Sequence, residues 1–227
     1  MEFYRMFVKG ELVPVWYRPF IEHESRASLL RVYHPPLVPG MLQTEAYPRA
    51  VLTGYRFQTD SLDGMLATRL GRQEILYRRP DPCHLVAVVD EGALHRRVGD
   101  ANVMRDQLKA LVTACEQPHI RVQVVPFDAG AYVGMDGALA IATVDGRLIG
   151  FLEGHLEGRL VESPDATTDL EGAWEAIRAY ALSSQQSLEL IMRTAEKPPA
   201  AGARRQGVLF TRESRLPAQT WHQVHDS

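Results

Sequence analysis

The sequence lacks the features that mark secreted proteins, membrane-spanning proteins and thiolate metal sites. Its 227 residues contain two cysteines, Cys83 and Cys115, and no CxxC pair, which excludes a four-thiolate zinc site. The N-terminal stretch, MEFYRMFVKGELVPVW, has neither the basic segment nor the apolar core of a secretory signal. No run of about 18 apolar residues could span a bilayer. We therefore expect a protein of the reducing cytoplasm, with free thiols and no membrane segment.

Excess positive charge is also missing. Lys and Arg number 25 against 28 Asp and Glu, which gives a formal net charge of -3. Domains that bind nucleic acid by themselves usually carry a basic face that displaces counterions from phosphates. We therefore expect no direct contact with nucleic acid. The length allows one large domain, or a domain with an added helical lobe.

The common catalytic and cofactor motifs are absent. The sequence contains no GxxxxGK[ST], GxGxxG, HExxH or GxSxG pattern. The glycine-rich stretch 130–137 lies between expected strands and indicates a loop. His155 and Glu157 match the HxE half of a zinc deaminase motif, but no PCxxC half follows. We therefore expect neither a metal nor a cofactor.

The stretch 85–162 predicts the sheet of the fold. The apolar run 85–89 and the run 120–125 flank an amphipathic segment that Asp100 can cap, which is typical of a βαβ unit with parallel strands. Asp145-Gly146 lies between the runs 138–144 and 148–153 and predicts an antiparallel hairpin, and 159–163 can add a further strand. The expected fold class is α/β (α+β), with a mixed sheet built from these two units.

Helices are expected on both sides of this stretch in the chain. Apolar spacing and capping residues predict helices over 16–32, 44–55 and 61–78, then from Ser163-Pro164 and from Ser183. We divide the chain into an N-terminal helical region, 1–82, and a mixed α/β core with C-terminal helices, 83–196. Residues 16–82 and the core are expected to form one compact domain, followed by a flexible tail, 197–227.

Polar residues follow the predicted strands, where ligands of open α/β sheets commonly bind. Candidates for acid–base catalysis are Glu91, His95, Asp128 and Glu153. Candidates for ligand contacts are Glu91, His95, Arg96, Tyr132, Glu153 and His155. The alternative is that the charged residues cap helices or solvate strand ends, and that Tyr132 packs in the core.

Several segments resemble one family of regulators. They are LVPGMLQTEAYPRAVL (37–52), an upstream helix with Glu24 and Ala27, RLGRQ (69–73) and VVDEGALHRRVGDANVMRDQL (88–108), and the similarity extends over about 16–195. They look like the C-terminal domain of actinobacterial, antitoxin-like helix-turn-helix transcriptional regulators. The resemblance implies a sensor or effector domain that usually follows a DNA-binding helix-turn-helix. Only about fifteen residues precede it here, too few for such a reader.

Two functions remain open from the sequence. The first is a regulatory module that binds a small-molecule ligand or a partner protein, or that pairs with a second copy as a homodimer. The second is an enzyme of secondary metabolism that has recruited the sensor pocket for acid–base chemistry on a small molecule. The resemblance and the missing catalytic signature favour the first. A truncated regulator without an independent role is the third, weaker alternative.

Overall fold

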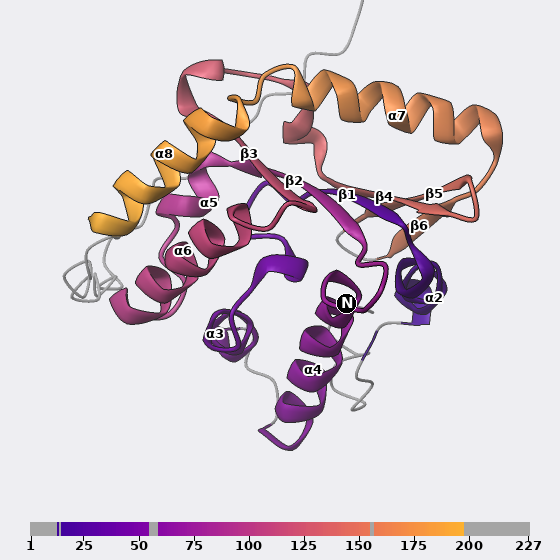
Figure 1. The fold of residues 1–227 in the computed structure, drawn as a ribbon. Coiled ribbons are helices and arrows are strands. Elements are labelled where there is room, and N and C mark those ends of the chain that lie inside the picture. The colour runs from indigo at the N-terminus through magenta and orange to yellow at the C-terminus, as the bar shows by residue number, and fades with distance from the viewer. Residues whose placement is uncertain (1–12, 14, 55–58, 155–156, 198–227) are drawn as a thin grey trace, which may run out of the picture.

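One mixed sheet of six strands runs through the protein, in the order β3-β2-β1-β4-β5-β6 (Figure 1). The computed structural model describes residues 13, 15–54, 59–154 and 157–197. The parallel part joins β1, β2 and β3, and the antiparallel part joins β1, β4, β5 and β6. This arrangement confirms the predicted α+β class. The strands are β1 (Leu29–Tyr33), β2 (His84–Asp90), β3 (Ile120–Val125), β4 (Ala138–Val144), β5 (Arg147–Glu153) and β6 (Gly158–Val161).

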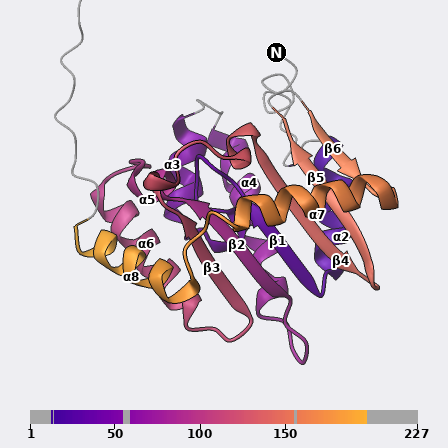
Figure 2. The same cartoon turned by 90° about the horizontal axis from the view of Figure 1, so that it is seen from above.

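Helices cover both faces of the sheet. The long helix α7 (Pro164–Arg178) crosses one face (Figure 2), where Trp174 packs with Tyr33, Val88 and Ile141. The other helices lie on the opposite face or at the β3 edge (Figure 1), and the larger apolar core is formed between them and the sheet. These are α2 (Arg18–Arg26), α3 (Ala46–Gly54), α4 (Thr59–Gly71), α5 (Glu91–His95), α6 (Ala101–Cys115) and α8 (Ser184–Glu196). In the described ranges, no helix is both long and apolar enough to cross a bilayer.

Local sequence signals are confirmed where one turn or one helix end decides the structure. Asp145 and Gly146 both have positive φ, 52° and 77°, as the predicted two-residue hairpin requires. The Asp100 side chain caps α6 by accepting hydrogen bonds from the N–H groups of residues 102 and 103. Ser183 and Gln186 form the predicted capping box of α8. Ser163 takes the N-cap position of α7, but its side chain accepts no helical N–H.

The prediction of one helix over 16–32 is wrong. The helix α2 ends at Arg26, and the chain then enters β1, the strand between β2 and β4. Each residue of β1 is paired on both sides, for example Val32 with Ala87 and with Ala140. Those partners lie more than fifty residues away, so tertiary pairing overrides the helical spacing of the local apolar residues. Residues 16–82 therefore contribute a central strand to the sheet as well as helices.

The other predicted helices start and end close to the predicted points, with one exception, and the short helix α5 was not predicted. The helix expected over 61–78 is α4, which ends at Gly71 and continues as the 3-10 helix η3 (Arg72–Leu76). The segment before α8 and the first turn of α8 cover the outer edge of β3. Leu182 donates its N–H to the Val124 carbonyl at 2.8 Å, and Ser187 Oγ accepts from the Val124 N–H at 3.0 Å. The expected tail beyond Lys197 lies outside the described residues.

Candidate functional site

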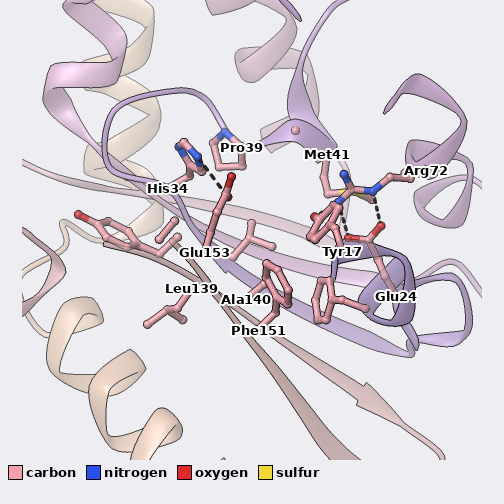
Figure 3. Close-up of a pocket in the computed structure, with 15 residues that line it drawn as sticks. Tyr17, Glu24, His34, Pro39, Met41, Arg72, Leu139, Ala140, Phe151 and Glu153 are labelled. Carbon is pink, nitrogen blue, oxygen red and sulfur yellow. Dashed lines mark hydrogen bonds and ion pairs between the residues drawn. The ribbon is translucent and has the colours of Figure 1, made fainter. Parts of the chain in front are cut away.

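A pocket of about 60 Å³ opens where the parallel and antiparallel parts of the sheet meet. It lies at the carboxyl end of β1, beside the start of β4 and the end of β5, since Tyr33 pairs with Leu139 and Ala138 with Glu153. A cavity needs about 10–15 Å³ to hold one water, so this pocket has room for a ligand group of a few non-hydrogen atoms. Figure 3 shows the residues that line it.

Aromatic and aliphatic side chains form one wall of the pocket. Phe151 on β5 lies against Tyr17 and Phe20, with ring centroids 4.8 Å and 5.1 Å apart. Met41 and Leu139 continue the apolar lining, and their exposed fractions are 3% and 7%. This surface suits the apolar part of a small molecule.

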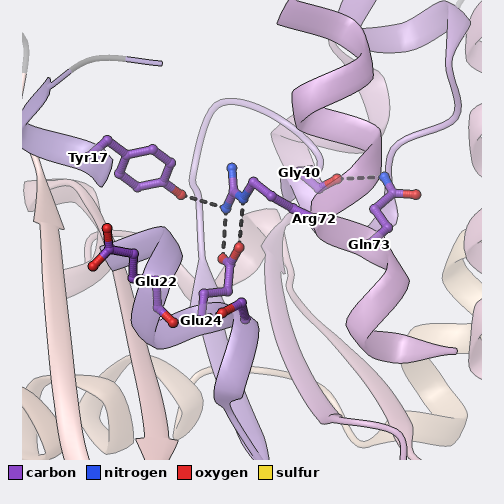
Figure 4. Close-up of polar contacts among 7 residues, drawn as sticks. Tyr17, Glu22, Glu24, Gly40, Arg72 and Gln73 are labelled. Carbon is purple, nitrogen blue, oxygen red and sulfur yellow. Dashed lines mark hydrogen bonds and ion pairs between the residues drawn. The ribbon is translucent and has the colours of Figure 1, made fainter. Parts of the chain in front are cut away.

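A buried ion pair forms a second wall. Arg72 donates to both carboxylate oxygens of Glu24, at 2.6 Å and 2.7 Å, and also to the Tyr17 hydroxyl at 2.6 Å (Figure 4). The Glu24 side chain is 2% exposed. Burial opposes the charge on Arg72, but Tyr17 and Glu24 outweigh it and raise the pKa of the guanidinium. Burial also raises the pKa of Tyr17 to about 12, so this phenol stays neutral and the triad is a fixed, closed unit.

Glu153 and His34 lie side by side in the lining of the pocket (Figure 3), with 3.6 Å between Oε2 and Nε2. Burial acts to raise the pKa of Glu153, but His34, and then Arg69 and Arg72, lower it below its usual value. The Glu153 side chain is 43% exposed, so water reaches the pair. Glu153 is therefore a carboxylate at neutral pH that an incoming ligand can contact.

The loop 34–43 over the pocket is held by amide side chains. Gln73 donates to the carbonyls of Gly40 and Gln43, both at 2.8 Å, and Gln107 donates to the Leu42 carbonyl at 2.7 Å. Gln107 is fully buried. Figure 4 shows Gln73 reaching Gly40 from the helical segment that also carries Arg72. The same short segment therefore positions both the ion pair and the loop that covers the pocket.

Two of the predicted site residues, Glu91 and His95, lie away from the pocket, in the helix that follows β2. Glu91 accepts the N–H of Phe127 at 2.8 Å and lies 3.4 Å from Nε2 of His95. Arg96 directly follows α5, and Asp128 lies in the 3-10 helix η4 (Phe127–Ala129). None of these four residues lines the pocket. Among the described residues, no group of three or more His, Cys, Asp or Glu could hold a metal ion.

Tyr132 takes part in a hydrogen-bond chain. Its hydroxyl donates to Asp90 Oδ2 at 2.8 Å and lies 2.6 Å from the Tyr33 hydroxyl. Because the Tyr132 proton goes to Asp90, Tyr33 is the donor to Tyr132. Burial, and then Tyr33 and Asp90, raise the pKa of Tyr132. His155 lies outside the described residues, so among the predicted candidates that the structure describes, Glu153 is the one that lines the pocket.

The pocket also contains residues that were not selected from the sequence as site candidates: Tyr17, Glu24, His34 and Arg72. Glu24 and Arg72 stand in segments that carry the family resemblance, which was the available signal. Their pairing spans 48 residues, and no local pattern indicates it.

A protein-family model described as a domain of unknown function, DUF5753, matches residues 17–193. The chain belongs to the DUF5753 family. The matched range contains the six strands, all the pocket-lining residues and most of α8. No curated protein matches the sequence. The pocket is thus a feature of the DUF5753 domain itself.

Proposed function

We propose that this DUF5753 domain is a regulatory module that binds a small molecule in the pocket at the carboxyl end of β1. The observation that carries the proposal is the pocket itself, where apolar surface around Phe151 meets the polar groups of Glu153 and His34. Ligand sites commonly combine an apolar lining with a few placed polar groups. The end of a parallel strand at a change in sheet topology is also a common place for them.

The regulatory part of the proposal rests on the resemblance to effector domains of antitoxin-like regulators. Such a module works through a partner protein or through a second copy of the chain, and this one is proposed to act in the cytoplasm without its own contact with nucleic acid. The ligand contacts loop 34–43 from inside, and that loop is joined to α4, η3 and α6. Occupancy of the pocket can therefore bias elements on the outer surface of the domain.

The test is native mass spectrometry of the full chain purified from the cells that naturally produce it. The same measurement is made on an Ala140→Leu variant. Ala140 lines the pocket, and a leucine there occupies the space that a ligand would take. The matched control is Ala179→Leu at the exposed end of α7, on the other face of the sheet. The proposal predicts a bound small molecule in the parent and control proteins and its loss in Ala140→Leu. A molecule retained equally by all three contradicts binding in this pocket.

A second candidate function is acid–base catalysis on the bound molecule, and the Glu153–His34 pair favours it. A carboxylate kept ionised beside an imidazole is a usable general base and acid, whereas Glu24 is fully engaged by Arg72. The co-purified molecule is incubated with fresh protein and followed by mass spectrometry. Chemical conversion that disappears in Glu153→Gln supports an enzyme, and release of the unchanged molecule supports the regulatory module.

A further inference from the structure

Arg69 is the one guanidinium beside the pocket that the described part of the chain leaves without a partner. Its Nε is buried and has no hydrogen-bond acceptor, and no ion pair or hydrogen bond joins the side chain to another described residue. Arg72, one helical turn later, differs in this respect because Glu24 takes up its charge. The residue as a whole is partly exposed, but its Nε–H is removed from water without an acceptor, which is costly.

Arg69 lies next to the pocket, beside Gly40, although its side chain is not itself part of the lining. A Cβ placed on Gly40, which lines the pocket, would lie 3.7 Å from both Nε and one terminal nitrogen of Arg69, so the guanidinium is close to this part of the lining. Burial, and then the like charge of Arg72, lower the pKa of Arg69, while Tyr17 and Glu153 oppose this. Tyr17, Arg72 and Glu153 also line the pocket. The free guanidinium therefore belongs to the same electrostatic environment as the cavity.

A second unsatisfied polar atom belongs to a residue that lines the pocket. His34 lines the pocket, and its Nδ1 is buried without a hydrogen-bond partner, while its Nε2 faces Glu153. Buried polar groups of folded proteins are nearly always hydrogen-bonded, so such exceptions need a partner that the described part of the chain does not supply. Because Nε2 of His34 is directed at the Glu153 carboxylate, Nδ1 of a neutral imidazole is an acceptor. The charged Nε–H donor of Arg69 is therefore the atom that indicates a missing group with acceptor oxygens.

We propose that the ligand of this pocket carries an anionic oxygen group, a carboxylate or a phosphate, that Arg69 binds while its apolar part packs on Phe151 and Met41. The inference rests on the proposed ligand-binding function and specifies its chemistry. A planar guanidinium with free N–H groups matches a two-oxygen anion in a bidentate manner. The two carboxylates that line the pocket agree with this, because each is paired with a cationic or imidazole group of the protein. Glu24 is paired with Arg72, and Glu153 is directed toward His34.

The test measures binding of defined probes to the full chain by ligand-observed NMR at millimolar concentration. The probes are isobutyrate and benzoate, their neutral amides, and inorganic phosphate. The variants are Arg69→Gln, Arg69→Lys, Ala140→Leu and, as a matched control, Arg193→Gln, which removes an exposed arginine of α8. The two acids and phosphate distinguish a carboxylate ligand from a phosphate ligand.

The expected result is that at least one anion binds about ten-fold or more tightly than the neutral amides. Arg69→Gln then removes this preference, Arg69→Lys keeps part of it, and Arg193→Gln keeps all of it. Ala140→Leu blocks every probe. In the ligand-free state Arg69→Gln should keep or raise Tm, because it removes a cation that no described residue pairs with.

Other outcomes separate the two proposals. Equal binding of acids and amides, or anion binding unchanged in Arg69→Gln, overturns the anionic ligand but leaves a small-molecule pocket in place. Failure of all anionic probes to bind also overturns it, and the co-purification experiment still decides the proposed function. A strong fall in Tm for ligand-free Arg69→Gln assigns Arg69 to the fold and overturns its role as a ligand contact. Binding that survives Ala140→Leu contradicts the pocket itself.

Discussion

Arg72 and Glu24 form a bidentate ion pair across 48 residues of sequence, and it joins η3 to α2 at the wall of the pocket. The pair couples the segment that covers the sheet to the helix that leads into β1. Arg72 also donates to the Tyr17 hydroxyl, which connects the ion pair to the aromatic wall of the pocket. The contact therefore helps to fix the position of this wall of the pocket.

Breaking this pair by one substitution is expected to destabilise the domain strongly. Arg72→Met leaves the Glu24 carboxylate buried without its cation, and such losses cost about 3–5 kcal/mol of unfolding free energy. The double variant Glu24→Met/Arg72→Met should recover most of that loss, because neither charge is then buried alone. Denaturant unfolding measures both.

The control for this experiment is the ion pair between Arg26 and Asp145, whose side chains are 63% and 73% exposed. Arg26→Met should change the free energy of unfolding by less than about 1 kcal/mol. A similarly small effect for Arg72→Met would mean that water solvates the Glu24 carboxylate in the variant and that the ion pair is not shielded from solvent.

The second prediction concerns the acid titration of Glu153. Its pKa is lowered in the folded state, so its contribution to stability is present above the unfolded carboxylate pKa of about 4.3 and is lost as the pH falls through the folded value. His34→Ala removes the first of the groups that lower this pKa, and the pKa should rise. Carboxyl carbon NMR of labelled glutamate follows the titration directly.

His23→Ala is the matched control for that titration. His23 lies 3.6 Å from Glu162, at the same separation as His34 from Glu153. Glu162, however, does not line the pocket. The titration of Glu153 should be the same in His23→Ala and in the parent. An unchanged Glu153 titration in His34→Ala would show that Arg69 and Arg72 alone set this pKa.

The sequence predicts those parts of the fold that neighbouring residues decide. Asp145-Gly146 specifies the hairpin because positive φ at both positions is a local requirement. The strand β1 was not predicted because its pairing with β2 and β4 comes from segments far along the chain. The same limit applies to the site. Glu153 could be selected as a strand-end carboxylate, but its partner His34 follows the strand that was missed.

The group around Glu91 illustrates a different limit. Proximity of Glu91 and His95 follows from their spacing of four residues in a short helix. What spacing does not show is that Glu91 already accepts the Phe127 N–H, which ties the end of β2 to the turn after β3. A strand-end acid can complete a backbone hydrogen bond or face a cavity, and only the position of distant backbone decides between them.

A third prediction tests how the outer edge of β3 is closed. Ser187 is fully buried and accepts the Val124 N–H at 3.0 Å. Ser187→Ala removes this acceptor and leaves a buried N–H unpaired, which costs about 1–3 kcal/mol. Ser184→Ala, in the exposed first turn of the same helix α8, should change stability much less. Chemical denaturation and amide exchange at Val124 measure the two effects, and slow exchange at Val124 in Ser187→Ala would contradict the assignment.

The last prediction concerns Tyr132, which lies in a chain of hydrogen bonds from Tyr33 to Asp90. Tyr132→Phe leaves Asp90 Oδ2 and the Tyr33 hydroxyl without this partner, at an expected cost of about 1–3 kcal/mol. The loop that follows, η5 (Val133–Asp136), packs against α7, so its amide hydrogens should exchange faster in the variant. Tyr180→Phe is the control, because Tyr180 contacts the Tyr132 ring but is 48% exposed. Equal stability and equal exchange in the two variants would show that Tyr132 is held by packing of its ring and not by its hydroxyl.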